Sequence, residues 1–326
     1  MEISDQRRHP YGLMQPYDII GDIHGYADLL EELLRKLGYE ERTGSWRHPL
    51  GRKALFIGDY IDRGPSIRRT LEIVRGMVET GAALALLGNH EFNALCYHTP
   101  NGAGGFLRSH SAKNEGQHKE TLAQLVLPDP KEWHSYLQWF KDLPLFLEIE
   151  GLRVVHASWD ANSIRLVRGR SFHDPDFLAA AATKDTPEFV AVETLLKGPE
   201  IPLPDGRTSP DKEGTERAEM RVAWWQARKR KKQLLYAEIA VPNAASIPET
   251  AVPAEVLSSL PSYSRREPPV IFGHYWLSAD TPQLLQANAA CVDYSVATKG
   301  GFLAAYSWSG EKKLKPEHFT VTNCLD

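Results

Sequence analysis

The sequence predicts an α/β fold, because short apolar segments of strand length alternate with amphipathic segments of helix length in its N-terminal third. Three such strands are predicted, at residues 17–20, 54–57 and 82–87, and each runs directly into a polar turn. Parallel strands joined by helices place their carboxyl ends at one edge of a sheet, where ligands bind. The repeated unit of strand, polar turn and helix therefore predicts one ligand site built from several turns.

The three turns carry side chains that bind metals or transfer protons. The first holds a carboxylate and an imidazole, the second two carboxylates and a guanidinium, and the third an amide, an imidazole and a carboxylate. An amphipathic helix is predicted after each turn, and the first two helices end at Gly38 and Gly81. In chain order these side chains are Asp22, His24, Asp59, Asp62, Arg63, Asn89, His90 and Glu91.

Two further histidines, His156 and His274, also follow predicted strands. Between the third strand-turn-helix unit and His156, a stretch rich in glycine and polar residues predicts a long loop. Two segments with apolar residues at helical spacing follow it and predict helices. The expected elements are a loop at 99–115, helices at 117–126 and 131–143, and strands at 145–149, 152–155, 270–272, 290–293 and 302–308.

Residues 159–267 interrupt this rhythm with prolines, charges and an alanine run. We expect one catalytic domain made of residues 16–158 and 268–326, with 159–267 inserted as a cap. A basic block at 228–232 lies within the insertion, and we interpret it as a solvated helix face rather than a nucleic-acid site.

The composition is that of a globular chain of 326 residues, with 42% hydrophobic and 25% charged residues. The net charge of −4 disfavours general binding to nucleic acids or membrane surfaces, which requires a basic field. Three widely spaced cysteines indicate neither a disulfide framework nor a zinc knot, and no segment has the length of a membrane span. A polar start without a signal-peptide core completes the expectation of a cytoplasmic protein.

The oxygen and nitrogen donors at the strand ends predict a metal site without sulfur, which suits Mn²⁺, Fe or Zn²⁺ better than Ca²⁺. A carboxylate can bridge two cations, and we expect Asp59 to do so. One cation would then be completed by Asp22 and His24, and the other by Asn89, His156 and His274.

Two cations roughly 3.5–4 Å apart can clamp a phosphoryl group and hold a bridging hydroxide that attacks it. The remaining side chains then have roles in the same reaction. We expect Arg63 to bind phosphoryl oxygens through its planar fork, His90 to protonate the leaving oxygen, and Asp62 to orient His90.

The series of turns resembles the calcineurin-like metallophosphoesterases, and within them the phosphoprotein phosphatase branch. The resemblance implies a metallophosphoesterase-type α/β fold, a β-sandwich flanked by helices with an inserted cap segment. It also implies a dinuclear site with the same residue roles, and Arg221 as a second phosphate-binding arginine. The motifs are Gly21-Asp22-Ile23-His24-Gly25, Gly58-Asp59-Tyr60-Ile61-Asp62-Arg63-Gly64, Gly88-Asn89-His90-Glu91, Val155-His156-Ala157 and Phe272-Gly273-His274.

Departures from the family pattern favour bacterial members, including those that resemble diadenosine-tetraphosphate hydrolases, over eukaryotic protein phosphatases. Leu87 stands where an arginine is usual, and Ala157-Ser158 replaces a glycine pair. Tyr275 and Trp276 after His274 replace the ending typical of nuclease-like relatives.

We therefore predict a metal-dependent phosphoesterase acting on a phosphorylated small molecule, nucleotide or phosphopeptide. A dinucleoside polyphosphate hydrolase is the alternative, and a nuclease or a noncatalytic scaffold are further ones. Histidines outside the motifs are expected to be surface or core residues without a part in the site: His9, His48, His98, His110, His118, His134, His173 and His318.

Overall fold

The computed structural model describes residues 14–149, 151–210, 216–226, 234–241, 247 and 249–323. The basic block at 228–232, the third cysteine, Cys324, and most of the polar N-terminal segment lie outside the described residues. Within the described part, none of the helices combines the length and apolar character that crossing a bilayer requires.

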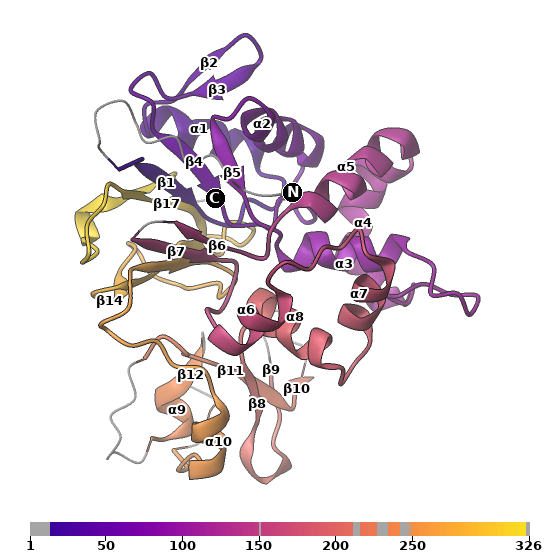
Figure 1. Ribbon diagram of the computed structural model, residues 1–326, viewed down its shortest axis with the longest axis vertical. Helices are drawn as coiled ribbons and strands as arrows, with labels where there is room; N and C mark the ends of the chain where they lie inside the picture. Colours follow the sequence, from indigo (N-terminus) through magenta and orange to yellow (C-terminus); the bar gives the residue numbers. More distant parts are fainter. Residues whose placement is uncertain are drawn as a thin grey trace.

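Two β-sheets stack face to face at the centre of the fold (Figure 1). In the first, β1, β4 and β5 run parallel, as predicted, and β17 pairs antiparallel with β1. Its six strands are β1 (Tyr17–Ile20), β4 (Lys53–Phe56), β5 (Ala83–Ala85), β16 (Asp293–Tyr294), β17 (Phe302–Trp308) and β18 (Phe319–Val321).

The second sheet has the strand order β14-β15-β13-β7-β6. Its β13 runs parallel to β7 and to β15, whereas β6 and β7 form the predicted antiparallel pair. Its five strands are β6 (Phe146–Ile149), β7 (Leu152–Val155), β13 (Val270–Phe272), β14 (Leu284–Gln286) and β15 (Ala289–Cys291).

Alternation along the strands explains why two sheets stack and why helices cover them. Successive side chains of a strand point to opposite faces. Ile19 belongs to the apolar cluster between the sheets, together with Val154 of the second sheet, whereas the next residue, Ile20, packs in the cluster under the helices. Both faces of each sheet are therefore apolar, and the helix-flanked β-sandwich expected from the sequence is confirmed.

Helices α1 and α2 cover the outer face of the first sheet (Figure 1), and their apolar stripes supply the buried Leu30, Leu34 and Leu71. Helix α5 begins where Asp129 accepts hydrogen bonds from two backbone N–H groups of its first turn. The bounds are α1 (Ala27–Lys36), α2 (Ile67–Glu79), α3 (Asn89–His98), α4 (Ala112–Thr121), the π-helical turn η1 (Leu122–Val126) and α5 (Pro130–Asp142).

The structure differs from the sequence predictions at the start of one helix and contains a hairpin that was not predicted. Helix α4 begins at Ala112, inside the predicted loop, because Ser111 caps it by accepting from the N–H of Asn114. A short hairpin of β2 (Glu40–Arg42) and β3 (Ser45–Arg47) was not predicted, because its charged residues show no apolar alternation.

The insertion contains two parts that pack differently. Its first helices and the pair Trp224 and Trp225 join the main apolar cluster, and both indoles lie near Phe272 of β13. Other described residues between β8 and α10 form a separate small cluster that includes Met220 and Tyr236, at the lower end of the view in Figure 1. The bounds are α6 (Ala161–Val167), α7 (Pro175–Ala182), α8 (Pro187–Lys197), β8 (Glu200–Pro202), η2 (Pro204–Gly206), β9 (Ser209–Pro210), β10 (Glu216–Arg217), β11 (Glu219–Val222), α9 (Tyr236–Ile239), β12 (Ala240–Val241) and α10 (Ala254–Ser259); a last 3-10 turn, η3 (Pro316–His318), precedes β18.

Candidate metal centre

The carboxyl ends of strands from both sheets converge on one buried cluster of side chains. The first sheet contributes the turns after β1 and β4 and the start of α3 after β5, whereas the second contributes the residues after β7 and β13. The clustered residues are each at most 7% exposed: Asp22, His24, Asp59, Asn89, His156 and His274.

Asp59 lies at the centre of this cluster. Its Oδ2 is 3.7 Å from His24 Nε2, and its Oδ1 is 3.5 Å from His156 Nε2. Two groups of potential ligand atoms each lie within 4.8 Å of one another: His24, Asp59 and His90 form one, and Asp59, His156 and His274 form the other. Asp59 is therefore the residue common to both groups, in the position that the sequence predicted for a bridging carboxylate.

The histidine rings are oriented as metal ligands require. His24 Nδ1 is 3.1 Å from the carbonyl oxygen of Ile61, and His156 Nδ1 is 2.8 Å from that of Ile57. An N–H donated to a backbone carbonyl fixes the tautomer and leaves the lone pair on Nε2. His24 Nε2 and both ring nitrogens of His274 are buried without a hydrogen-bond partner among the described residues, which fits coordination to a cation.

The electrostatics of the cluster also fit a cation. Burial, with the charges of Asp293 and Asp59, raises the pKa of Asp22 well above its ordinary value. Burial alone would raise the pKa of Asp59 too, but His156, His90 and His24 around it lower that pKa well below the ordinary range. Burial lowers the pKa of His24 to about 3, so this imidazole is neutral at pH 7 and able to coordinate a metal.

Asp22 and Asn89 lie beside the two groups and contact histidines of the cluster. The Asp22 carboxylate accepts the backbone N–H of His274 at 3.1 Å, and the first group contains His90 in addition to His24 and Asp59. Asn89 Oδ1 lies 3.0 Å from His156 Nε2, beside the second group. The cluster thus contains all six predicted donors, with Asp22 and Asn89 engaged to neighbouring histidines.

Next to the cluster, His90 and Asp62 form the expected pair, with 2.6 Å between Nδ1 and Oδ2. Burial opposes the charge on Asp62, but hydrogen bonds from His118 and His90 lower its pKa below the ordinary value. Burial lowers the pKa of His90, but the charges of Asp59 and Asp62 raise it by more, so the pKa lies above its ordinary value. An anionic Asp62 therefore favours the protonated form of His90.

Two residues near this pair were given no individual role in the sequence interpretation. His118 Nδ1 lies 2.8 Å from Asp62 Oδ1, although His118 was expected to have no part in the site. The fully buried Glu91 accepts backbone N–H groups from the central turn, at 2.8 Å from Asp59 and from Tyr60. Glu91 thereby fixes the loop that presents Asp59, a function that its place in the Gly88-Asn89-His90-Glu91 motif could have signalled.

Backbone strain is concentrated at the same place. Six of the ten non-glycine residues with positive φ in the described chain belong to the cluster or its rim, and each such conformation costs about 1–3 kcal/mol. Gly58 has φ +106°, and a Cβ there would lie 2.5 Å from the backbone of Gly88, so the second and third turns touch. The six residues are His24, Asp59, Asp62, Arg63, His274 and Trp276.

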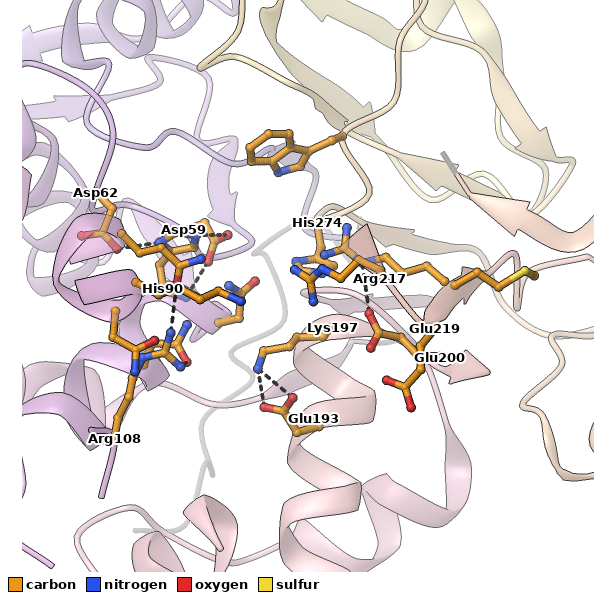
Figure 2. A pocket seen from close by; sticks show the side chains of 18 of the residues that line it. Asp59, Asp62, His90, Arg108, Glu193, Lys197, Glu200, Arg217, Glu219 and His274 are labelled. Atoms are coloured by element: carbon orange, nitrogen blue, oxygen red, sulfur yellow. Dashed lines mark hydrogen bonds and ion pairs between the residues drawn. The ribbon is translucent and has the colours of Figure 1, made fainter. Parts of the chain in front are cut away.

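A cavity of about 680 Å³ opens onto the cluster. Figure 2 shows Asp59, His90 and Arg108 on one side of it and His274 and Lys197 on the other. The guanidinium carbon of Arg63 lies 3.9 Å from the ring centroid of Trp276. The cationic side chains that line the cavity are Arg63, Arg108, Lys113, Lys197, Arg217 and Arg221.

A helix-flanked β-sandwich that carries histidines and aspartates at its converging strand ends is the architecture of a metallophosphoesterase. The chain belongs to the calcineurin-like phosphoesterase family, whose sequence profile matches residues 16–236.

Individual relatives are similar over shorter stretches. The chain is 30% identical over 140 residues to a bis(5'-nucleosyl)-tetraphosphatase PrpE [asymmetrical] of Oceanobacillus iheyensis. The aligned stretch covers 43% of this chain and 54% of that protein. It is 49% identical over 74 residues to the protein of the same name from Halalkalibacterium halodurans, covering 23% of this chain and 30% of the relative. The chain thus spans about a third to a half of the length of these relatives.

Among solved structures, a protein serine/threonine phosphatase from Saccharomyces cerevisiae with similarity to human phosphatase PP5 aligns over 97% of this chain and 81% of its own. Its TM-score is 0.50 at 13% sequence identity. At this identity the likeness concerns the fold alone.

Proposed function

We propose that this protein is a metal-dependent phosphoesterase whose reaction takes place at the cluster around Asp59. The position of Asp59 between two groups of histidine ligands is the observation that carries the proposal. A scaffold protein would have no need for buried imidazole nitrogens without hydrogen-bond partners, such as His24 Nε2 and those of His274, because such groups cost free energy unless a ligand compensates them.

We propose that two divalent metal ions are held by six residues, with Mn²⁺ as the first candidate and Fe or Zn²⁺ as alternatives. Bound there, the cations would polarise phosphoryl oxygens and activate the attacking water. The set of ligands would be Asp22, His24, Asp59, Asn89, His156 and His274.

The chain's own residues would perform the remaining steps. Arg63, held against the ring of Trp276, would bind two phosphoryl oxygens with its planar fork. His90 would donate a proton from Nε2 to the leaving oxygen, because its Nδ1 is engaged by Asp62. Arg221 lines the same cavity, which supports its proposed contact with phosphate.

Dinucleoside polyphosphates are the substrate class that we favour. Of the cationic side chains that line the cavity, Lys197 is paired with Glu193 and Arg221 with Glu200. Arg108 donates hydrogen bonds to the amide oxygens of Asn93 and Gln117 rather than to a carboxylate, so its positive charge remains available for a second phosphate. The name of the bacterial relatives, bis(5'-nucleosyl)-tetraphosphatase, agrees with this choice.

A substrate panel with Mn²⁺ tests the function. The panel contains a phosphopeptide, a dinucleoside tetraphosphate, a mononucleotide, a single-stranded RNA with a terminal phosphate, and para-nitrophenyl phosphate, with Asp59→Ala as the matched blank. We expect metal-dependent turnover that is absent from the blank, and the highest kcat/KM on the dinucleoside tetraphosphate. Turnover that persists without metal, or equally in the blank, would contradict the proposal.

We further propose that residues 159–267 act as a cap beside a catalytic domain formed by 16–158 and 268–326. Arg217 and Arg221, from β10 and β11 of the insertion, line the same cavity as His90, which supports this division. We also propose a cytoplasmic location, since Cys96 and Cys291 are free thiols buried in the fold.

A further inference from the structure

The helix formed by α4 and η1 lies against the loop that carries Asp59, Asp62 and Arg63. Three of its side chains, spaced three residues apart, bind this loop: His118, Thr121 and Gln124. Gln124 accepts the backbone N–H of Ile67 at 2.8 Å and donates to the carbonyl oxygen of Gly64 at 2.9 Å. The π-helical turn begins directly after Thr121, and such turns are frequent at functional sites.

The two carboxylate oxygens of Asp62 have different partners. Oδ1 accepts hydrogen bonds from His118 Nδ1 at 2.8 Å and from the Thr121 hydroxyl at 2.6 Å. Oδ2 is engaged by His90 Nδ1 at 2.6 Å. Because Oδ1 is held from the helix side, rotation of the carboxylate is blocked and Oδ2 stays directed at His90.

His118 is itself immobilised. It is 5% exposed, and its Nε2 lies 3.2 Å from Nε2 of His98. The rings of Tyr97 and Trp133 pack around it, with centroid distances of 5.3 Å and 5.8 Å. Nδ1 of His118 is paired with Asp62 and Nε2 with His98, so every polar atom of the imidazole is paired.

We propose that His118 is a positioning residue for the general acid. It fixes the Asp62 carboxylate, and the fixed carboxylate aligns His90 with the leaving oxygen of the substrate. This inference rests on the proposed phosphoesterase function. It assigns His118 an indirect part in proton transfer to the leaving group and none in metal or phosphate binding.

Leaving-group dependence distinguishes this role from general support of the fold. Proton donation matters for an alkyl phosphate and scarcely for para-nitrophenyl phosphate, whose leaving group is a weak base. We expect His118→Ala to lower kcat on an alkyl phosphate by at least about tenfold, below the ceiling of about 10²–10⁴ for loss of the acid itself. On para-nitrophenyl phosphate we expect little change, with KM unaltered on both substrates.

Two matched variants separate the hydrogen bond from the packing. His118→Asn retains an amide donor close to the position of Nδ1 and is expected to recover much of the alkyl-phosphate activity, whereas the similarly sized His118→Leu is not. Gln124→Ala removes contacts from the same helix to the same loop without touching Asp62. Any loss in Gln124→Ala should be equal on the two substrates.

A double-mutant cycle with His90→Ala measures whether His118 acts through His90. Once the acid is absent its alignment no longer matters, so adding His118→Ala to His90→Ala should cost no further activity on the alkyl phosphate. Equal losses of His118→Ala on both substrates, or additive losses in the cycle, would overturn the inference. Failure of wild-type metal-dependent turnover would instead overturn the proposed function, and substrate-independent losses in His90→Ala alone would overturn the acid role of His90 on which the inference rests.

Discussion

Asp59 and His156 follow strands of opposite sheets, and Asp59 Oδ1 lies 3.5 Å from His156 Nε2. The apolar cluster that joins the sheets includes Leu55 and Val154 of the two strands concerned. The candidate metal site therefore forms only when the sandwich is assembled, and a metal bound there would stabilise the packing of the two sheets.

Arg63→Lys should impair turnover, because an ammonium group cannot reproduce the planar fork. Hydrogen bonds to charged groups are worth about 1.5–3 kcal/mol, so kcat/KM should fall about ten- to a hundredfold. The measurement is steady-state kinetics on para-nitrophenyl phosphate. Arg35→Lys is the control. Arg35, on α1, also stacks on a tryptophan, with 5.2 Å between its guanidinium carbon and the ring centroid of Trp46. If the two variants were alike, Arg63 would have no part in phosphate binding.

Arg108→Met tests the substrate class. Methionine keeps the apolar stem but removes the charge proposed to bind a second phosphate. We expect kcat/KM for a dinucleoside tetraphosphate to fall by at least about tenfold, the loss of one charged hydrogen bond, with little change for para-nitrophenyl phosphate. Arg170→Met, at an arginine stacked on Phe177 in the insertion, is the control. A loss of the same size on both substrates would contradict a role in selecting polyphosphates.

Glu91→Gln should destabilise the fold although it preserves the size of the side chain. One Glu91 oxygen accepts the backbone N–H groups of Tyr60 and Ile61, and the other accepts those of Asp59 and Gly88. In the variant, the amide NH₂ would place a donor against one of these pairs of donors. Leaving buried donors unpaired costs about 1–3 kcal/mol in the free energy of unfolding, measurable by urea denaturation. Glu79→Gln, at the exposed end of α2, should stay within about 0.5 kcal/mol of wild type. Equal stability of the two variants would remove Glu91 from this structural role.

His98 should make stability depend on pH. Burial and the neighbouring His118 and His110 lower the pKa of His98 from 6.5 to about 4. As the pH falls below 6.5, His98 takes up a proton in the unfolded chain but not yet in the folded protein, which favours unfolding. The stability that the neutral His98 contributes above pH 6.5 is therefore lost as the pH falls towards about 4. His98→Gln should lose less stability than wild type over this interval in urea titrations at fixed pH. His134→Gln, on α5, is the control, and parallel curves for all three proteins would contradict the assignment.

The fold and the six donors of the cluster could be predicted because each donor directly follows a strand. The apolar segments fix the strands, and parallel pairing of β1, β4 and β5 then places Asp22, Asp59 and Asn89 at one edge. Which ligand pairs with which was not predictable in full, since the Asp22 carboxylate turns to the backbone of His274, more than two hundred residues away in sequence.

The sequence gives little indication of the residues that contact or line the site from outside the strand ends. His118 lies in a polar helical segment whose charged residues indicate a solvent-facing surface, and only the tertiary fold brings it to Asp62, 56 residues earlier. Arg108 lies in a segment predicted as a loop, where sequence spacing does not determine direction. Long-range contacts of single polar side chains therefore required the structure.

The metal content of four proteins measures the central claim most directly. After purification with Mn²⁺ and removal of free metal, inductively coupled plasma mass spectrometry gives the number of ions per chain for wild type, His24→Ala, His274→Ala and Asp59→Ala. With Asp59 as the shared ligand, we expect two ions in wild type, one in each histidine variant and none in Asp59→Ala. Retention of one or two ions by Asp59→Ala would contradict the bridging role of this carboxylate.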